Sequence, residues 1–160
     1  MKNLSRRDLC VALSAFAAMG SVSGAEAQVL LPPVSPGTKV LSESEAFPFD
    51  KLPVSHSKNG GESRHVIQGV LPTGEYVEMH ETTLPPGQMP HPPHKHRHSE
   101  FMMIRVGTVE FDNDGRKETV GPGGVLFAAS DKMHGLKNVG TVAAQYFVIA
   151  IGRESGLQRV

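Results

Sequence analysis

Short β-favouring runs separated by turn residues fill the chain from about residue 65 to residue 152, and this alternation restricts its fold most strongly. Runs such as "YVEMHETTL", "EFMMIRVG" and "AAQYFVIAIG" are bounded by turn-forming stretches such as "PTGE", "PPGQ" and "GPGG". Strands of about five to nine residues, spaced about eight to twelve apart, are typical of antiparallel sandwiches and barrels. The pattern therefore predicts an all-β domain over residues 62–153.

The clearest turn in this region is Asp112-Asn113-Asp114-Gly115, which separates the runs "TVEF" and "RKETV". An Asp-Gly pair between two β-favouring runs predicts a tight hairpin. Beyond the N-terminal segment, no stretch keeps apolar residues at helical spacing. We therefore expect strands and turns, and no long amphipathic helix, after residue 27.

Residues 1–27 have the features of an export signal peptide. Lys2, Arg6 and Arg7 form a basic head, an apolar run too short to span a bilayer follows, and Ala25-Glu26-Ala27 is a cleavage site of the small-x-small type. The twin arginines resemble the bacterial signal for export of folded proteins. A general secretory signal that carries two arginines is the alternative. Either signal predicts a periplasmic or secreted protein.

Three further segments can be predicted from composition. Residues 28–61 are rich in Pro, Ser and Gly, which indicates an extended arm or linker with at most a short strand near Thr38 to Leu41. Residues 62–153 form the β-domain, and residues 154–160 a C-terminal tail. A chain of 160 residues is long enough for one such domain and its core.

Charge and cysteine content limit the classes of partner and of metal site that this chain can have. The chain has 16 basic and 16 acidic residues, so nothing indicates a nucleic-acid partner or binding to an anionic membrane. We expect a small-molecule partner instead. The one cysteine, Cys10, lies in the leader, so the mature protein should contain no thiol. Any metal ion must then be held by nitrogen and oxygen.

Four of the eight histidines lie within "HPPHKHRHSE", residues 91–100. His94 and His96 are two positions apart, so on a strand their side chains leave the same face. Two neutral imidazoles in one small space need partners for their ring nitrogens, and a divalent cation is such a partner.

Two downstream residues complete a candidate metal site. Glu100 shares strand parity with Met102, Ile104 and Val106, which predicts an inward side chain, and an inward carboxylate is costly unless it is paired or bound to metal. His134 opens another strand after a polar turn. Three imidazoles and one carboxylate would leave a divalent ion with open positions, as in catalytic sites.

Two stretches resemble the motifs of the cupin superfamily. In "GQMPHPPHKHRHSEFMMIRVG", a glycine, HxHxxxE, six residues and a glycine are matched by His94, His96, Glu100 and Gly107. In "GGVLFAASDKMHGLKN", a second motif of glycine, five residues, PxG, two residues, His, three residues and Asn is matched at Gly123, His134 and Asn138. The resemblance covers about residues 64–151.

The resemblance implies a double-stranded β-helix, the cupin jelly-roll barrel, with a metal ion inside one end. Its ligands would be His94, His96, Glu100 and His134. Two departures stand out: six residues rather than five separate Gly87 from His94, and Ala129 and Asp131 replace the usual Pro and Gly before His134. The second departure alters the turn that aims His134.

The remaining histidines have simpler interpretations. His98 shares parity with His94 and His96, but the family pattern places it in a bend, facing solvent or behind the ligands. His91, next to two prolines, is interpreted as a loop residue, and His65 and His80 as ordinary strand residues. Some cupin-like barrels hold no metal, and that alternative stays open.

The resemblance also implies the chemistry. Imidazole and carboxylate ligands suit one divalent transition metal ion, and although affinity alone would favour Cu, export after folding favours Mn or Fe, with Ni, Cu or Zn possible. The ion would serve a dioxygenase-like oxidoreductase similar to quercetin dioxygenases. The substrate would be a chelating enol, catechol or flavonol, with Glu100 as the catalytic base. The alternatives are a lyase of the oxalate decarboxylase type and a non-enzymatic ligand-binding protein. We expect an apolar interior with few groups for a strongly charged substrate.

A homodimer is predicted from the arm. Residues 28–61 have no apparent core of their own, and such arms in cupins often add a strand to a neighbouring subunit.

Overall fold

The computed structural model describes residues 38–153, which contain nine β-strands, one short 3₁₀ turn and no α-helix. The expectations for the leader, the first part of the arm and the C-terminal tail concern residues outside this range. In the described part, no helix is long and apolar enough to cross a membrane.

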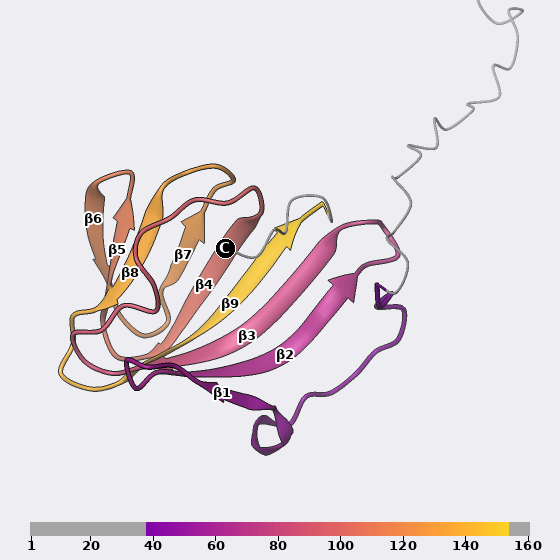
Figure 1. Cartoon of the computed structure of the whole chain (residues 1–160), viewed down its shortest axis with the longest axis horizontal. Helices are drawn as coiled ribbons and strands as arrows, with labels where there is room; N and C mark the ends of the chain where they lie inside the picture. Colours follow the sequence, from indigo (N-terminus) through magenta and orange to yellow (C-terminus); the bar gives the residue numbers. More distant parts are fainter. Residues whose placement is uncertain (1–37, 154–160) are drawn as a thin grey trace, which may run out of the picture. The chain divides into compact units, whose positions relative to one another are not determined.

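The strands form two antiparallel sheets (Figure 1). The larger sheet, in the order β1-β2-β3-β9-β4-β7, consists of β1 (Val54–His56), β2 (Glu62–Val70), β3 (Tyr76–Leu84), β9 (Ala144–Gly152), β4 (Ser99–Val106) and β7 (Val125–Ala128). The smaller sheet, in the order β6-β5-β8, consists of β6 (Arg116–Val120), β5 (Val109–Asn113) and β8 (His134–Asn138). The prediction of an all-β jelly-roll barrel is confirmed.

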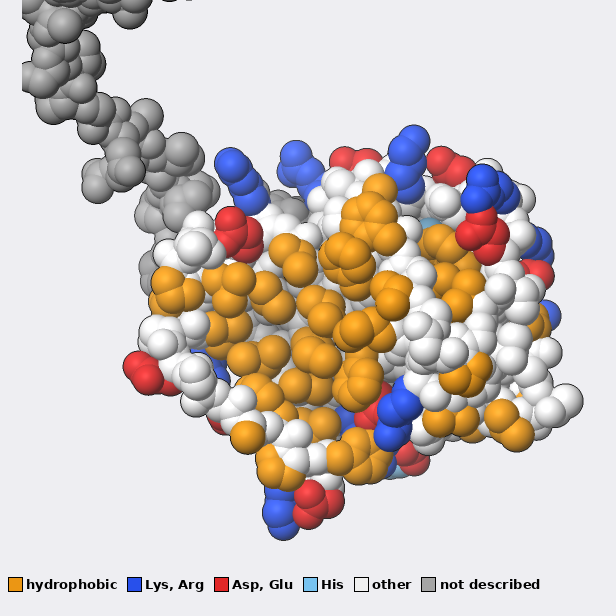
Figure 2. Space-filling view, turned by 180° about the vertical axis from the view of Figure 1, so that it is seen from behind, with side chains coloured by type: hydrophobic (Ala, Val, Ile, Leu, Met, Phe, Trp, Pro, Cys, Tyr) orange, Lys and Arg blue, Asp and Glu red, His pale blue; other side chains and the backbone are white. Residues whose placement is uncertain are grey.

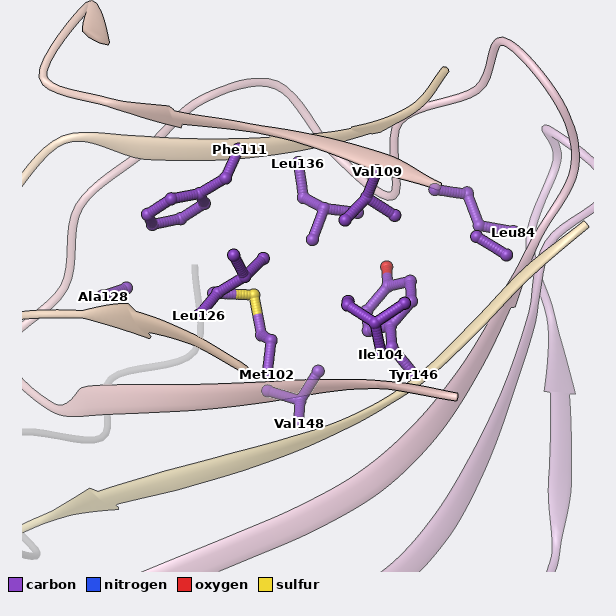
Figure 3. Packing of buried hydrophobic residues seen from close by; sticks show 11 residues of the cluster. Leu84, Met102, Ile104, Val109, Phe111, Leu126, Ala128, Leu136, Tyr146 and Val148 are labelled. Carbon is purple, nitrogen blue, oxygen red and sulfur yellow. The ribbon is translucent and has the colours of Figure 1, made fainter. Parts of the chain in front are cut away.

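The core lies between the two sheets. Inward positions alternate along β4, β7 and β9 in the larger sheet, as expected for a pleated strand with one buried face. Their side chains meet those of β5 and β8 (Figure 3), and the buried cluster includes Leu84, Met102, Ile104, Val109, Phe111, Leu126, Ala128, Leu136, Ala144, Tyr146 and Val148. The closed core fixes the position of the strands that carry the polar site.

The predicted hairpin is present. Asn113 pairs with Arg116, which leaves Asp114 and Gly115 as a two-residue turn between β5 and β6. Their φ angles are 52° and 87°, the left-handed values that this turn requires. The Asp112 carboxylate accepts a hydrogen bond of 2.8 Å from the Gly115 backbone N–H.

The described part of the expected arm lies against the larger sheet. Val40 forms a parallel bridge with Val70, a 3₁₀ turn covers Phe49–Lys51, and β1 adds an edge strand that the sequence analysis did not predict. Gly69 permits the close approach, because a Cβ atom there would lie 2.5 Å from the Lys39 carbonyl oxygen. This segment covers part of the sheet of its own chain.

One predicted inward position is wrong. Met102 and Ile104 are buried, but Val106 is 38% exposed. The register of β4 against β9 shifts between Ile104 and Val106, and an extra residue in a strand reverses the facing of those that follow. The predicted alternation of inward and outward side chains along β4 therefore holds only as far as Ile104.

The outer face of the larger sheet is apolar. Figure 2, seen from behind Figure 1, shows a broad area of hydrophobic side chains. The outward positions of β4, β7 and β9 include the exposed residues Phe101, Val125, Phe127 and Ile151. Arg105 also faces outward, as predicted, and its guanidinium lies 2.6 Å from the buried Glu81 carboxylate.

Candidate metal centre

His94 and His134 are brought together by backbone pairing. They form an isolated antiparallel bridge, in which each backbone N–H donates to the other residue's carbonyl, at 2.9 and 2.8 Å. Directly opposed residues of an antiparallel pair project their side chains to the same side. The two ring centroids are accordingly 4.8 Å apart. These two hydrogen bonds thus bring together two residues that are forty positions apart in the sequence.

Backbone carbonyls orient two of the three imidazoles. Nδ1 of His96 lies 2.9 Å from the His98 carbonyl oxygen, and Nδ1 of His134 lies 2.9 Å from the Lys132 carbonyl oxygen. Because a carbonyl can only accept, Nδ1 carries the proton in both rings and Nε2 presents a lone pair. Metal-binding histidines are commonly oriented by a hydrogen bond of this kind.

One ring nitrogen from each of His94, His96 and His134 lies within 4.8 Å of the others. Nδ1 of His94 and Nε2 of His96 and His134 are buried and have no hydrogen-bond partner. Buried polar atoms are normally satisfied, so the unpartnered nitrogens of three neighbouring imidazoles require a partner. A divalent cation fits this donor set, and these residues could hold it.

Glu100 lies between the imidazoles at the start of β4. Its Oε1 is 3.2 Å from Nε2 of His96, and its Oε2 is 3.6 Å from Nε2 of His134. Burial alone would raise the pKa of Glu100, but the surrounding imidazoles, first of all that of His134, outweigh burial and hold the pKa well below its ordinary range. The carboxylate is therefore charged, as a metal ligand must be.

The imidazoles respond to burial in different ways. Burial, together with repulsion from His91, His134 and His96, lowers the pKa of His94 to about 4. Burial also disfavours protonation of His96, but its contact with Glu100 prevails and raises the pKa. His94 is consequently neutral near pH 7, the form that coordinates a metal.

The altered turn before His134 keeps the required backbone shape. Asp131, at the position of the usual motif glycine, has a φ of 59°. Aspartate tolerates this left-handed region better than most residues do. The Asp131 N–H donates to the His96 carbonyl at 2.7 Å, which ties the turn to the ligand segment. The departure from the motif therefore does not turn His134 away.

His98 does not face solvent. It is 9% exposed, its ring stacks on that of His96 with a centroid distance of 3.5 Å, and its Nε2 lies 3.0 Å from Oε1 of Glu100. His96, His98 and Glu100 thus form a second group whose ligand atoms lie within 4.8 Å. Of the two settings expected for His98, the structure has the one next to the ligands.

His91 is exposed, as expected of a loop residue, but it is not remote from the site. Its ring meets that of His94 edge to face, with centroids 4.1 Å apart. It also lines the cavity described next.

The metal centre opens into a cavity of about 710 Å³. Most of the residues that line it carry polar side chains, more than an apolar interior would lead us to expect, although carbon atoms make up much of the exposed surface. The lining includes the candidate ligands His94, His96 and Glu100, and on β2 and β3 it includes His65, Gln68, Tyr76, Glu78 and His80. His65 and His80 are therefore not ordinary strand residues.

The sequence pattern of β3 indicates that its polar residues line this cavity. Tyr76, Glu78, His80, Thr82 and Leu84 share one parity, and Leu84 is in the core. The buried end of β3 thus marks the inward face, and the polar residues of that parity must then face the cavity. The sequence analysis did not extend the parity argument to this strand.

A smaller cavity of about 310 Å³ adjoins the same centre from the core side. Glu100 and His134 line it together with the apolar residues Met102, Leu136 and Val148. Tyr146 lies here as well, and burial raises the pKa of its hydroxyl well above the ordinary range. The centre thus lies at the boundary between an apolar floor and a polar mouth.

Comparison with known proteins agrees with this architecture. Residues 80–150 match a family model described as Cupin domain. A comparison with curated protein sequences found no match.

Several solved structures have the same fold. KdgF from Halomonas sp. is 17% identical, with a TM-score of 0.59 over 71% of this chain and 98% of that chain. An RmlC-like cupin from Shewanella frigidimarina is 19% identical, with a TM-score of 0.57 over 70% and 96%. A predicted oxalate decarboxylase from Thermotoga maritima is 20% identical, with a TM-score of 0.57 over 67% and 98%.

At these identities, the likeness in structure concerns the fold alone. The family match covers β4 and β8, which carry Glu100 and His134, and the loop before β4 that carries His94 and His96. Residues 80–150 are thus similar to the cupin domain, and the jelly-roll architecture of the described residues agrees with that match.

Proposed function

We propose that this protein is a metal-dependent oxidoreductase of the dioxygenase type, acting on a small chelating enol, catechol or flavonol. The observation that carries the proposal is a group of three imidazoles, two buried and one half-buried, with unpartnered nitrogens beside a charged carboxylate. His94, His96, Glu100 and His134 would hold one divalent transition metal ion, with Mn or Fe favoured and Ni, Cu or Zn as alternatives.

Such an ion, when bound, supplies Lewis-acid and redox chemistry and positions for substrate and dioxygen. The chain's own residues supply the rest. The cavity of about 710 Å³ admits an aromatic or enolic ring, and Met102 and Val148 give apolar surface to the smaller cavity on the other side of Glu100. Glu100, charged and close to three imidazoles, is placed to exchange a proton with a ligand in the cavity.

The cavity lining bears on the alternative of an oxalate decarboxylase-like lyase. Among the residues that line the two cavities, none is Lys or Arg. A small dianion would find only imidazoles as cationic partners, beside the carboxylates of Glu78 and Glu100. A neutral or singly charged hydroxylated ligand suits this lining better.

Turnover assays test the proposal. Metal-loaded protein is incubated with a catechol, a flavonol and oxalate while oxygen uptake and carbon dioxide release are recorded. The proposal predicts oxygen uptake with the catechol or the flavonol. Carbon dioxide release from oxalate without oxygen uptake supports the lyase, and tight binding without turnover supports a binding protein. Either of these two results refutes the proposal.

Alanine variants connect the assay to the site. Replacing His94, His96, Glu100 or His134 by alanine should remove most of the bound metal, measured by elemental analysis, because a three- or four-ligand site loses geometry with each ligand. The exposed Lys95, between two of the ligands, offers a matched control. Lys95→Ala should retain the metal.

The cellular setting remains part of the proposal. A twin-arginine leader would deliver the protein already folded to the periplasm, so the metal could be loaded in the cytoplasm, where copper is scarce. We expect Mn or Fe in protein purified from the native periplasm. Full occupancy by copper or zinc in that material would contradict this expectation.

A further inference from the structure

A second charged group lies across the cavity from the candidate metal centre. In the pairing of β3, β9 and β4, Glu78 lies opposite Ala150, and Ala150 lies opposite Glu100. The two carboxylates therefore share one row of the sheet, with Cα atoms two strand spacings apart, roughly 10 Å. Between them the only side chain is the methyl group of Ala150, which lines the cavity. A ligand above Ala150 would reach both sides.

Glu78 forms a close pair with His80 on the same face of β3. Both carboxylate oxygens of Glu78 lie 3.0 Å from Nδ1 of His80. A carboxylate only accepts hydrogen bonds, so Nδ1 is the protonated nitrogen of this ring. The tautomer leaves the lone pair of His80 on Nε2.

Nε2 of His80 is free to act on a ligand. Within residues 38–153, this atom has no hydrogen-bond partner, and the side chain is 27% exposed. The ring lines both the larger and the smaller cavity. An imidazole oriented by a carboxylate, with its other nitrogen facing a cavity, is the arrangement that serves proton transfer in many enzymes.

The neighbouring residues support this assignment. His65 is paired with His80 in the register, but its Nδ1 is 3.9 Å from Glu78, too far for a hydrogen bond, and its side chain is 47% exposed. The Gln68 amide donates a hydrogen bond to the Tyr76 hydroxyl, so these two cavity-lining side chains are partnered with each other. Only His80 combines a fixed tautomer with an unpartnered nitrogen on this wall.

We propose that His80, held by Glu78, is the proton acceptor for a hydroxylated ligand in this cavity, an inference that rests on the proposed function for the class of ligand. The O–H bond of the ligand breaks and its proton bonds to Nε2 of His80. The electron pair of the broken bond stays on the ligand oxygen. The imidazolium so formed is stabilised by the charge of Glu78 through the Nδ1–H hydrogen bond.

The test counts protons and does not need turnover. Binding of 4-nitrocatechol to the metal-loaded full chain is followed by calorimetry in two buffers of different ionisation enthalpy, which gives the number of protons released to solvent. With His80 present, one proton stays on the protein. We expect the His80→Gln variant to release about one proton more per ligand than the unchanged protein, and Glu78→Gln to release an intermediate number.

A matched control is available in β1. His56 and Glu62 also form an imidazole–carboxylate pair, at 3.6 Å; both line the smaller cavity but not the larger one, and the His56 side chain is 72% exposed. His56→Gln should leave the proton count unchanged. Elemental analysis should give the same metal content in all variants, which separates loss of the proton acceptor from loss of the metal.

Three results would overturn the inference. The first is an equal proton count for His80→Gln and the unchanged protein, and the second is no binding of 4-nitrocatechol to the unchanged protein. The third is nitrogen NMR of the unchanged protein showing the proton of His80 on Nε2, which keeps the inference testable if a variant fails to fold. An altered proton count without oxygen uptake would keep His80 as the acceptor and refute only the oxidoreductase proposal.

Discussion

At the scale of single residues, the site depends on imidazoles whose environments differ. His94 has no carbonyl behind it and is held neutral by burial, whereas His96 is tied to the His98 carbonyl and to Glu100. His94, which is held neutral in the folded protein, should be sensitive to acid. The pH dependence of stability should report this directly.

Lowering the pH should reduce the free energy of unfolding of the metal-free protein, because His94 binds a proton more readily in the unfolded chain. The pKa of this residue is about 4 in the folded protein and about 6.5 in the unfolded chain, so the unfolded chain binds a proton that the folded protein does not. The stability that neutral His94 contributes is full above about pH 6.5 and is lost as the pH falls towards 4. The loss is at most about 1.4 kcal/mol per pH unit, and less because His94 is half-buried.

Urea unfolding at stepped pH checks this prediction. His94→Gln should flatten the acid slope relative to the unchanged protein, since the other groups are common to both. An identical slope would mean that His94 is protonated normally in the folded state.

Asp131 should tolerate replacement by glycine and not replacement by valine. Its φ of 59° is natural for glycine and strained for β-branched residues. We expect Asp131→Gly to change stability by less than about 1 kcal/mol and to keep the metal, and Asp131→Val to cost about 1–3 kcal/mol and to weaken metal binding. Thermal unfolding and elemental analysis measure both, and equal effects of Gly and Val would refute a role of backbone conformation.

Among the secondary-structure elements, the position of the site depends on the hydrogen bonds that hold the ends of the strands together. β8 carries His134 at its start and Asn138 at its end. The Asn138 side chain is 0% exposed, and its amide donates to the carbonyls of Leu84 and Val142, both at 2.8 Å. One side chain thus connects β8 to the end of β3 and to the turn before β9.

Loss of this connection should be costly. Asn138→Ala removes the side-chain donor of the Leu84 and Val142 carbonyls and leaves the Gly140 N–H with the Thr108 carbonyl alone, so we expect a loss of about 2–4 kcal/mol in the free energy of unfolding. Urea unfolding measures it. Lys137→Ala, at the exposed neighbouring position, is the control and should stay within about 0.5 kcal/mol of the unchanged protein.

At the scale of the whole domain, a metal ion would connect three parts of the chain. The candidate ligands come from the loop before β4, from β4 and from β8, which belong to different sheets. An ion that binds only the folded protein stabilises it by about 2.7 kcal/mol at a hundredfold excess over its Kd. We expect Tm to fall by roughly 10 °C when a chelator removes the metal and to recover when Mn or Fe is returned.

The matched control for this experiment is Glu100→Gln. It should unfold at a temperature that the chelator and added metal hardly change. A metal-dependent Tm in this variant would place the ion elsewhere.

The outer face of the larger sheet bears on assembly. Val125 and Phe127 are 59% and 50% exposed on an apolar face, and the chain has no net charge to keep copies apart (Figure 2). We expect a homodimer, and Phe127→Lys should shift it towards monomer in light scattering. Val142→Lys, equally exposed in the turn before β9, should not.

Deletion of residues 28–61 separates this face from the arm as the cause of dimerisation. Loss of the dimer only in the deletion would favour the arm. An unchanged dimer mass would leave the sheet face as the interface.

The sequence by itself determined the strands and the main residues of the site, because both follow from local periodicity. Alternation and turn residues predicted the β-domain, and the spacing of His94, His96 and Glu100 placed their side chains on one face. The motif match also identified His134. These features repeat every two residues or lie within one short segment, so no long-range contact is needed to read them.

Only the tertiary structure decided which other groups face the same cavity. His80 and Glu78 lie on β3, and their position opposite Glu100 depends on β9 lying between β3 and β4. A shift in register turned Val106 outward, and a bend brought His98 onto Glu100. Strand order and register are set by packing between distant segments, which local periodicity does not encode.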